Sequence, residues 1–142
     1  MQLTDEPPVI AFSINKTNMT HDMLMRSNEF NISVLTDEAP KELFRIFSTK
    51  SGRDINKFEE FSNVNRSPNG ILYLSKYINA RLSGRVIHSI DAGTHTLFSG
   101  KITDAEVINN KKTLTYSEYR KQNSFNHLDE TCHSSICCVV VR

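Results

Sequence analysis

A long alternating stretch in the second half of the chain constrains the fold more than any other feature. Over residues 78–90, apolar or small side chains alternate with polar ones, and Ile87 alone breaks the polar face. This period of two predicts a long strand with one face against a core. Residues 91–93 supply turn chemistry, and residues 94–107 predict the returning strand. The hairpin expected over residues 77–108 favours an antiparallel barrel or sandwich over a parallel sheet.

Length and composition suit a single domain and exclude several classes of function. The chain has 142 residues, and its 17 basic and 16 acidic residues nearly cancel. Because there is no basic block and no interleaving of aromatic and basic residues, we expect no nucleic-acid binding. No apolar run reaches the roughly 18 residues that a membrane helix needs, and the start, MQLTDEPP, is unlike a signal peptide. We therefore expect a cytoplasmic protein without membrane association.

Near its start, the chain combines a predicted buried strand with a polar loop. Residues 8–14 favour a strand, and a helix N-cap candidate, Thr20, follows shortly after the loop. The loop itself consists of Asn15, Lys16, Thr17 and Asn18. Backbone N–H groups and the dipole at a helix N-terminus favour an anion, and Lys16 adds positive charge. We interpret this loop as a candidate phosphate site, and an ordinary capped strand-to-helix loop remains the alternative.

The other elements follow from shorter patterns. We expect a helix over residues 20–28, a strand over residues 30–35, a helix from Thr36 or Asp37 to about Ser48, a further helix from Asp54, and a closing strand or turn over residues 113–121. The tail that follows ends in an apolar run, which either adds a strand or stays loose.

Taken together, five stretches resemble one family in order and spacing. They are MQLTDEPPVIAFSINKTNMTH, FNISVLTDEAP, SGRDINKF, SIDAGTHTLFSGKITDAEVI and LTYSEYRK. The chain resembles the flavin reductase-like, FMN-binding split-barrel family, in particular the NAD(P)H-dependent type found as flavoredoxins and in high-molecular-weight rubredoxins. The resemblance implies a mainly β (α+β) fold, an antiparallel split β-barrel with short helices. It also implies that the first barrel strands are missing, because family members carry further residues ahead of the position matching Gln2.

The resemblance divides the chain into two parts and assigns a function to the first. Residues 1–121 match an FMN-binding flavin reductase-like domain, N-terminally incomplete, and residues 122–142 form a cysteine-containing tail without an assigned domain. The implied function is an NAD(P)H-dependent flavin oxidoreductase that passes electrons to flavin, rubredoxin or a similar acceptor. In such proteins the flavin carries the redox chemistry, so the absence of a catalytic triad or carboxylate pair is expected.

Specific side chains are assigned by the same resemblance. The implied cofactor-binding residues are Gln2, Thr4, Asn15, Lys16, Asn18, Thr20, Ser51, Arg53 and Lys57. Lys16 or the backbone after it is placed near the pyrimidine edge of the flavin, and Asn18 and Thr20 toward its ribityl or phosphate group. His95 matches a position where nicotinamide docks, and we take it as the candidate catalytic residue.

Two other histidines lie in this part of the chain. His21 follows the predicted cap and is interpreted as either structural or functional. His88 lies on the apolar face of the predicted strand, so we expect a core or dimer-interface residue. Relatives in the family are homodimers with flavin near the subunit interface, which implies a homodimer here.

The tail contains all three cysteines, Cys132, Cys137 and Cys138. A rubredoxin iron needs four thiolates, so we expect no metal, with a three-cysteine site completed by His127 or His133 as the alternative. For the whole chain, the alternative to an active reductase is a truncated, catalytically weak flavin-binding or structural dimer module. A split-barrel protein that binds heme or another planar ligand is a third possibility, which the phosphate-favouring loop argues against.

Overall fold

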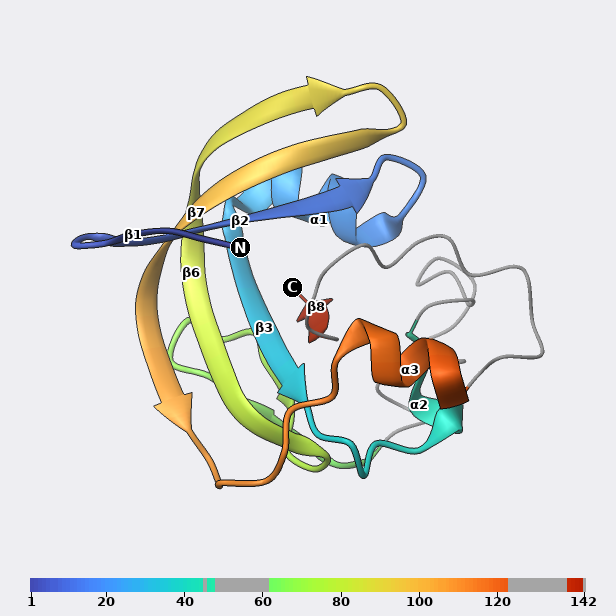
Figure 1. The fold of residues 1–142 in the computed structure, drawn as a ribbon. Helices are drawn as coiled ribbons and strands as arrows, with labels where there is room; N and C mark the ends of the chain where they lie inside the picture. Colours follow the sequence, from blue (N-terminus) through green and yellow to red (C-terminus); the bar gives the residue numbers. More distant parts are fainter. Residues whose placement is uncertain (45, 48–61, 123–137, 142) are drawn as a thin grey trace.

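The protein is built on one antiparallel sheet, shown in Figure 1. The computed structural model describes residues 1–44, 46–47, 62–122 and 138–141. The sheet has six strands in the order β1-β2-β7-β6-β3-β8. Their bounds are β1 Gln2–Asp5, β2 Pro8–Asn15, β3 Glu29–Leu35, β6 Ile78–Ala92, β7 His95–Val107 and β8 Cys138–Val141. A separate two-stranded hairpin consists of β4 Val64–Arg66 and β5 Leu72–Leu74. The predicted antiparallel, mainly β class is confirmed.

The β6–β7 hairpin forms the centre of the sheet, as the alternating sequence predicted. The two strands curve strongly in Figure 1, and their register shifts at Ser83/Gly84 and at Val86/His88. Such bulges increase twist and bend a strand. Because of the bend, the first half of β6 pairs with β3 while the first half of β7 pairs with β2. The sheet therefore curls around an apolar interior.

This interior is centred on the ring of Phe30, which is fully buried. Its buried members are Leu24, Phe30, Ile32 and Phe98, with Ile10, Phe12, Ile14, Leu82, Val86 and Ile102 packed against them. The ring of Phe30 lies over two glycines of the hairpin. A Cβ on Gly100 would stand 2.6 Å from Phe30 Cζ, and one on Gly84 would stand 2.6 Å from the Lys101 carbonyl oxygen. Both positions therefore require glycine.

Helix α1 (Met19–Ser27) connects β2 to β3 and covers this interior with Leu24. It begins one residue earlier than predicted, and its N-cap is Asn18 rather than Thr20. Its C-cap residue, Asn28, has φ of 57°, a left-handed conformation that asparagine tolerates and that ends the helix.

A second apolar cluster lies at the other end of the molecule, around helices α2 (Lys41–Phe44) and α3 (Tyr116–Gln122). Its buried members are Leu35, Ala39, Leu43, Leu74, Ile78, Leu114 and Tyr119. Phe44 and Phe47 pack against it, as the predicted stripe requires. Figure 1 shows the two helices next to each other below the open side of the sheet.

Two predictions for this end of the chain were wrong. The helix expected from Thr36 or Asp37 begins only at Lys41, because Thr36 is still held in a bridge to Thr113. The strand or turn expected over residues 113–121 is mostly helix α3, which has a capping box. Thr115 N donates to Glu118 Oε2 at 3.0 Å, and Glu118 N donates to Thr115 Oγ1 at 3.3 Å.

The two ends of the chain lie on opposite edges of the sheet. Ahead of β2 the structure has one strand, β1, in the region where the first barrel strands were expected to be missing. The apolar end of the tail adds strand β8, which pairs with β3. The helix expected from Asp54 lies outside the described residues. Within the described ranges, no helix is long and apolar enough to span a membrane.

Candidate functional site

The polar loop after β2 lies directly against the turn of the β6–β7 hairpin. Asn15, the last residue of β2, is paired with His95, the first residue of β7. Lys16 N then donates a hydrogen bond to the carbonyl oxygen of Thr94 at 3.0 Å. Because of this pairing, two segments nearly 80 residues apart in sequence form one corner of the molecule. We call residues 15–20 with residues 91–95 the β2–α1 corner.

Local hydrogen bonds fix the shape of the loop. Asn15 Oδ1 accepts from both Thr17 N and Thr17 Oγ1 at 2.9 Å, which is an Asx turn. Asn18 N donates to Asn15 O at 3.0 Å, so the chain turns directly into α1. The exposed side chain of Asn18 makes no capping hydrogen bond to the helix. The N-terminus of α1 therefore has no side-chain cap, which suits it to an anionic ligand.

An ion pair connects the loop to the hairpin. Lys16 Nζ lies 2.7 Å from Asp91 Oδ2. Asp91 Oδ1 accepts a second hydrogen bond from Gly93 N at 2.8 Å, within the turn where Gly93 has φ of 81°. The bond from Lys16, followed by that from Gly93, lowers the pKa of the Asp91 carboxyl. Both ends of the pair remain accessible, since the Lys16 side chain is 36% and the Asp91 side chain 73% exposed.

The corner has two faces because neighbouring residues of a strand point to opposite sides. One row of residues crosses strands β2, β7 and β6. In this row Thr96 is paired with Ile14 on one side and with Asp91 on the other. This row faces α1, since Thr96 Oγ1 lies 2.8 Å from His21 Nε2. The adjacent row, Asn15, His95 and Ala92, therefore faces the other side. His95 is half-buried there, with Nδ1 2.8 Å from Thr94 Oγ1.

The structure gives His21 a packing role. Its ring lies 5.8 Å from that of Phe98, and its bond to Thr96 ties the first turn of α1 to β7. Its Nδ1 is buried without a hydrogen-bond partner and lies 3.6 Å from Asp22 Oδ1. The core interpretation of His88 was wrong, because His88 is exposed. The bulge between Val86 and His88 shifts the alternation that had placed it on the apolar face.

The predicted cofactor-binding residues fall into three groups. The β2–α1 corner contains Asn15, Lys16, Asn18, Thr20 and His95, with Asn15 and His95 on the face away from α1. Gln2 and Thr4 lie on β1 opposite Ile10 and Val9, at the other end of β2. Ser51, Arg53 and Lys57 lie outside the described residues, as do Cys132 and Cys137 of the tail. In the parts of the chain that the structure describes, no group of three or more His, Cys, Asp or Glu residues is placed to hold a metal ion.

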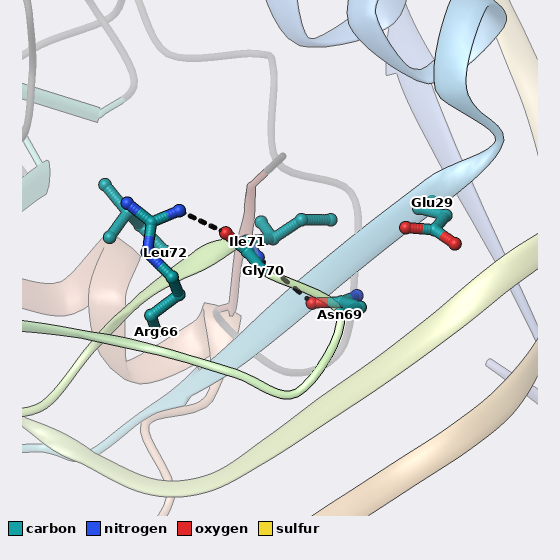
Figure 2. A pocket seen from close by; sticks show the side chains of 6 residues that line it. All are labelled: Glu29, Arg66, Asn69, Gly70, Ile71 and Leu72. Carbon is teal, nitrogen blue, oxygen red and sulfur yellow. Dashed lines mark hydrogen bonds between the residues drawn. The ribbon is translucent and has the colours of Figure 1, made fainter.

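A cavity of about 310 Å³ lies elsewhere, between the start of β3 and the β4–β5 hairpin. Figure 2 shows its lining residues, Glu29, Arg66, Asn69, Gly70, Ile71 and Leu72. The polar groups there already bind the protein itself. Arg66 donates to the Gly70 carbonyl, Glu29 pairs with Arg85 at 2.9 Å, and Asn69 Oδ1 accepts from Ile71 N. We assign the candidate site to the β2–α1 corner instead, because a lysine lies there beside a helix N-terminus that has no side-chain cap.

An apolar groove of about 300 Å³ opens beside the N-terminal edge of the sheet. It is lined by Gln2, Pro8, Val9, Ile10, Leu82, Ile102 and Ala105. Gln2 therefore lines this groove. Its side-chain amide already donates a hydrogen bond to Asp5.

Fold and corner together define a class: a curled antiparallel barrel with a polar loop and a helix N-terminus at one mouth. Residues 1–124 match the model of the flavin reductase like domain. The chain belongs to this family, which comprises flavin reductase-type oxidoreductases.

Two curated relatives extend this match. The chain is 41% identical to a high molecular weight rubredoxin of Moorella thermoacetica over 84% of its length, and spans 52% of that protein. It is 35% identical to the ferric-chelate reductase (NAD(P)H) of Archaeoglobus fulgidus, over 83% of this chain and 69% of the relative. The chain thus spans about half to two-thirds of the length of these relatives.

Solved structures share the fold. An NADH:FAD oxidoreductase from Streptomyces globisporus superposes with a TM-score of 0.71 at 18% identity, over 79% of this chain and 66% of that one. An FMN-binding protein from Thermus thermophilus gives a TM-score of 0.68 at 22% identity, over 75% of this chain and 58% of that one.

Proposed function

We propose that this chain binds FMN and uses NAD(P)H to reduce it, passing the electrons to free flavin, rubredoxin or a similar acceptor. One observation carries the proposal: a lysine and a helix N-terminus without a side-chain cap meet at the mouth of a flavin reductase fold. The two relatives support the choice of partners, since one is a high molecular weight rubredoxin and the other a ferric-chelate reductase (NAD(P)H).

The residues of the corner fit the phosphate group of FMN. Lys16 supplies a positive charge, Thr20 a hydroxyl in the first turn of α1, and Asn18 an exposed amide with no capping bond. Charge-assisted hydrogen bonds of this kind contribute roughly 1.5–3 kcal/mol each when water is excluded. In this proposal Ser51, Arg53 and Lys57 add further contacts to the phosphate, and Gln2 and Thr4 cover another part of the cofactor.

Bound FMN would supply the hydride acceptor, and the protein's contribution is binding, orientation and charge. His95 is proposed to hydrogen-bond the carboxamide or pyrophosphate of NAD(P)H through Nε2, since Nδ1 is already engaged by Thr94. Asn15 lies beside it on the same face, and its amide nitrogen is proposed as a further donor, since Oδ1 already accepts from Thr17. Lys16 is suited to stabilise negative charge on the phosphate, or on the pyrimidine edge when the flavin is reduced.

A homodimer is part of the proposal. Ile90 and Leu97 are opposite each other on the hairpin, on the face of His95, and are 62% and 38% exposed. Pairing of two copies through this face would bury them and bring His95 close to the partner subunit. Analytical ultracentrifugation of the full chain tests this, and a monomer at micromolar concentration would contradict it.

The cofactor site is tested with Lys16→Ala. We expect FMN binding, followed by flavin fluorescence, to weaken about tenfold or more, as loss of a charge-assisted hydrogen bond implies. The matched control is Lys111→Ala, which removes another ion-paired lysine, bound to Glu38 beyond the far end of β7. Equal affinities for wild type, Lys16→Ala and the control would contradict the assigned role of Lys16.

Activity is tested with the purified protein. NAD(P)H-dependent bleaching of the flavin absorbance supports the reductase. FMN retained without reduction by either nicotinamide would support the alternative, a catalytically weak flavin-binding or structural dimer module. A colourless protein that takes up no added FMN would contradict both.

A further inference from the structure

The ion pair between Lys16 and Asp91 brings a negative charge to the place proposed for an anion. Lys16 is the lysine of the β2–α1 loop, and its Nζ contacts Asp91 Oδ2 at 2.7 Å. Asp91 is at the turn of the hairpin, opposite Thr96 and on the face that α1 covers. The carboxylate therefore lies on the same face as the helix N-terminus and occupies the lysine that a phosphate would use.

Asp91 is held in this position by the turn itself. Its Oδ1 accepts from Gly93 N at 2.8 Å, while Oδ2 remains for Lys16. The backbone on both sides is fixed, because Lys16 N donates to Thr94 O at 3.0 Å. The lysine and the carboxylate thus stay within reach of each other without requiring a ligand.

We infer that Asp91 sets the selectivity of this site between phosphorylated and unphosphorylated flavin, by competing with the flavin phosphate for Lys16. The inference rests on the proposed function. A phosphate monoester carries a charge of roughly −1.5 to −2 at neutral pH. Binding it must break or share the Lys16–Asp91 contact and place two anions near each other. Riboflavin, which lacks the phosphate, meets neither penalty.

The consequence is an affinity for FMN held below what the lysine and the helix N-terminus would otherwise give. Repulsion between like charges near the surface acts through a high effective dielectric and is screened by salt, so the effect is moderate. A lower affinity for FMN suits a protein that exchanges flavin with solution. A site without Asp91 would bind FMN with a lower Kd.

The experiment compares wild type with Asp91→Asn in binding both FMN and riboflavin. Asparagine keeps an oxygen for the Gly93 N–H and removes the charge. At low ionic strength we expect the Kd for FMN to fall about three- to tenfold, as loss of one screened like-charge contact implies. The Kd for riboflavin should change less than about twofold. The difference between the variants should shrink as salt is added, because screening weakens the repulsion.

Two further variants keep the test decisive. Asp91→Ser again removes the charge and keeps an oxygen at the turn, and should shift FMN binding in the same direction. Glu38→Gln makes the same change in net charge beyond the far end of β7, where Glu38 pairs with Lys111, and should leave both affinities unchanged. Thermal melts show whether each variant remains folded.

The inference is overturned if neutral variants at Asp91 bind FMN no more tightly than wild type. It is equally overturned if FMN and riboflavin tighten together, because the charge would then act on the ring rather than on the phosphate. If wild type binds neither flavin, the proposed function itself fails, which is a separate outcome.

Discussion

Two regions of this molecule reach stability by different means. The barrel region, formed by β2, α1, β3 and the β6–β7 hairpin, packs aromatic rings against glycine backbone, with Phe30 at its centre. The base region, formed by α2, α3 and the β4–β5 hairpin, combines tyrosines and leucines with the capping box of α3 and its ion pair with Lys112. The candidate site lies on the barrel region alone. We therefore expect changes in the buried core of the barrel to reach the site, whereas changes on the exposed surface of the barrel or in the base alter stability with little effect on binding.

The largest loss of stability in the barrel region is expected from a substitution at Gly100. A Cβ there would overlap the ring of Phe30, and overpacking of a core typically costs about 1–3 kcal/mol. We expect Gly100→Ala to lower the free energy of unfolding by about 2–3 kcal/mol in urea titrations, and to weaken flavin binding as well. Adding Phe30→Leu should restore part of the loss, because it removes the overlapping ring atoms. Ser99→Ala on the same strand is the control, and a loss as large as that of Gly100→Ala would contradict this explanation.

The junction of the two regions should be the next most sensitive place. Arg81 on β6 pairs with Asp104 at 2.6 Å and Glu106 at 2.8 Å, and its guanidinium lies over the ring of Tyr73 on β5. Its side chain is 11% exposed. Arg81→Met removes all of these contacts, and we expect a loss of about 1–2 kcal/mol, because the two carboxylates can still reach water.

Arg85→Met is the matched control for Arg81. Arg85 makes one exposed ion pair with Glu29, and such pairs contribute less than about 1 kcal/mol. Urea titrations should therefore show a smaller loss for Arg85→Met. Flavin affinity should remain near the wild-type value in both variants. Equal losses of stability would show that burial of Arg81 is unimportant.

The base region should show the smallest effect, and one that depends on pH. Lys112 and the Thr115 backbone and hydroxyl bind Glu118, and together lower its pKa from 4.5 to about 2. A carboxyl with a depressed pKa in the folded state stabilises the protein above its unfolded pKa and loses that contribution as it is protonated. Glu118→Gln should therefore melt below wild type at pH 6. The difference should narrow as pH falls from about 4.5 toward 2. A difference in melting temperature that stays constant between pH 4.5 and about pH 2 would contradict the capping role.

The difference between the two regions also explains which elements the sequence predicted. Strands β2, β3, β6 and β7 have long alternating or apolar runs, so their period identifies them. The bulges in the β6–β7 pairing, which leave His88 exposed, do not follow from that period. Helix α3 was mistaken for a strand or turn, although its capping box, Thr115 with Glu118, is readable in the sequence. Strands β4 and β5 have three residues each, too short for a period to be recognised.

The site was predictable only in part. The polar loop and its nearness to the hairpin turn followed from motif order and the family resemblance, and the bond between Lys16 N and Thr94 O places them together. The pairing of Lys16 with Asp91 was missed, because 75 residues separate them and both have other plausible roles in the sequence. That Thr96 faces α1 and His95 faces the other side follows from the contact between Thr96 and His21, which a motif does not encode.

The loop after β2 is anchored on one side by the β2–β7 pairing and on the other by α1, whose Leu24 is fully buried. Folding has therefore already restricted the loop's motion before any ligand arrives. Association with a small anion at such a place loses little conformational entropy, so contacts made there are converted into affinity with little loss.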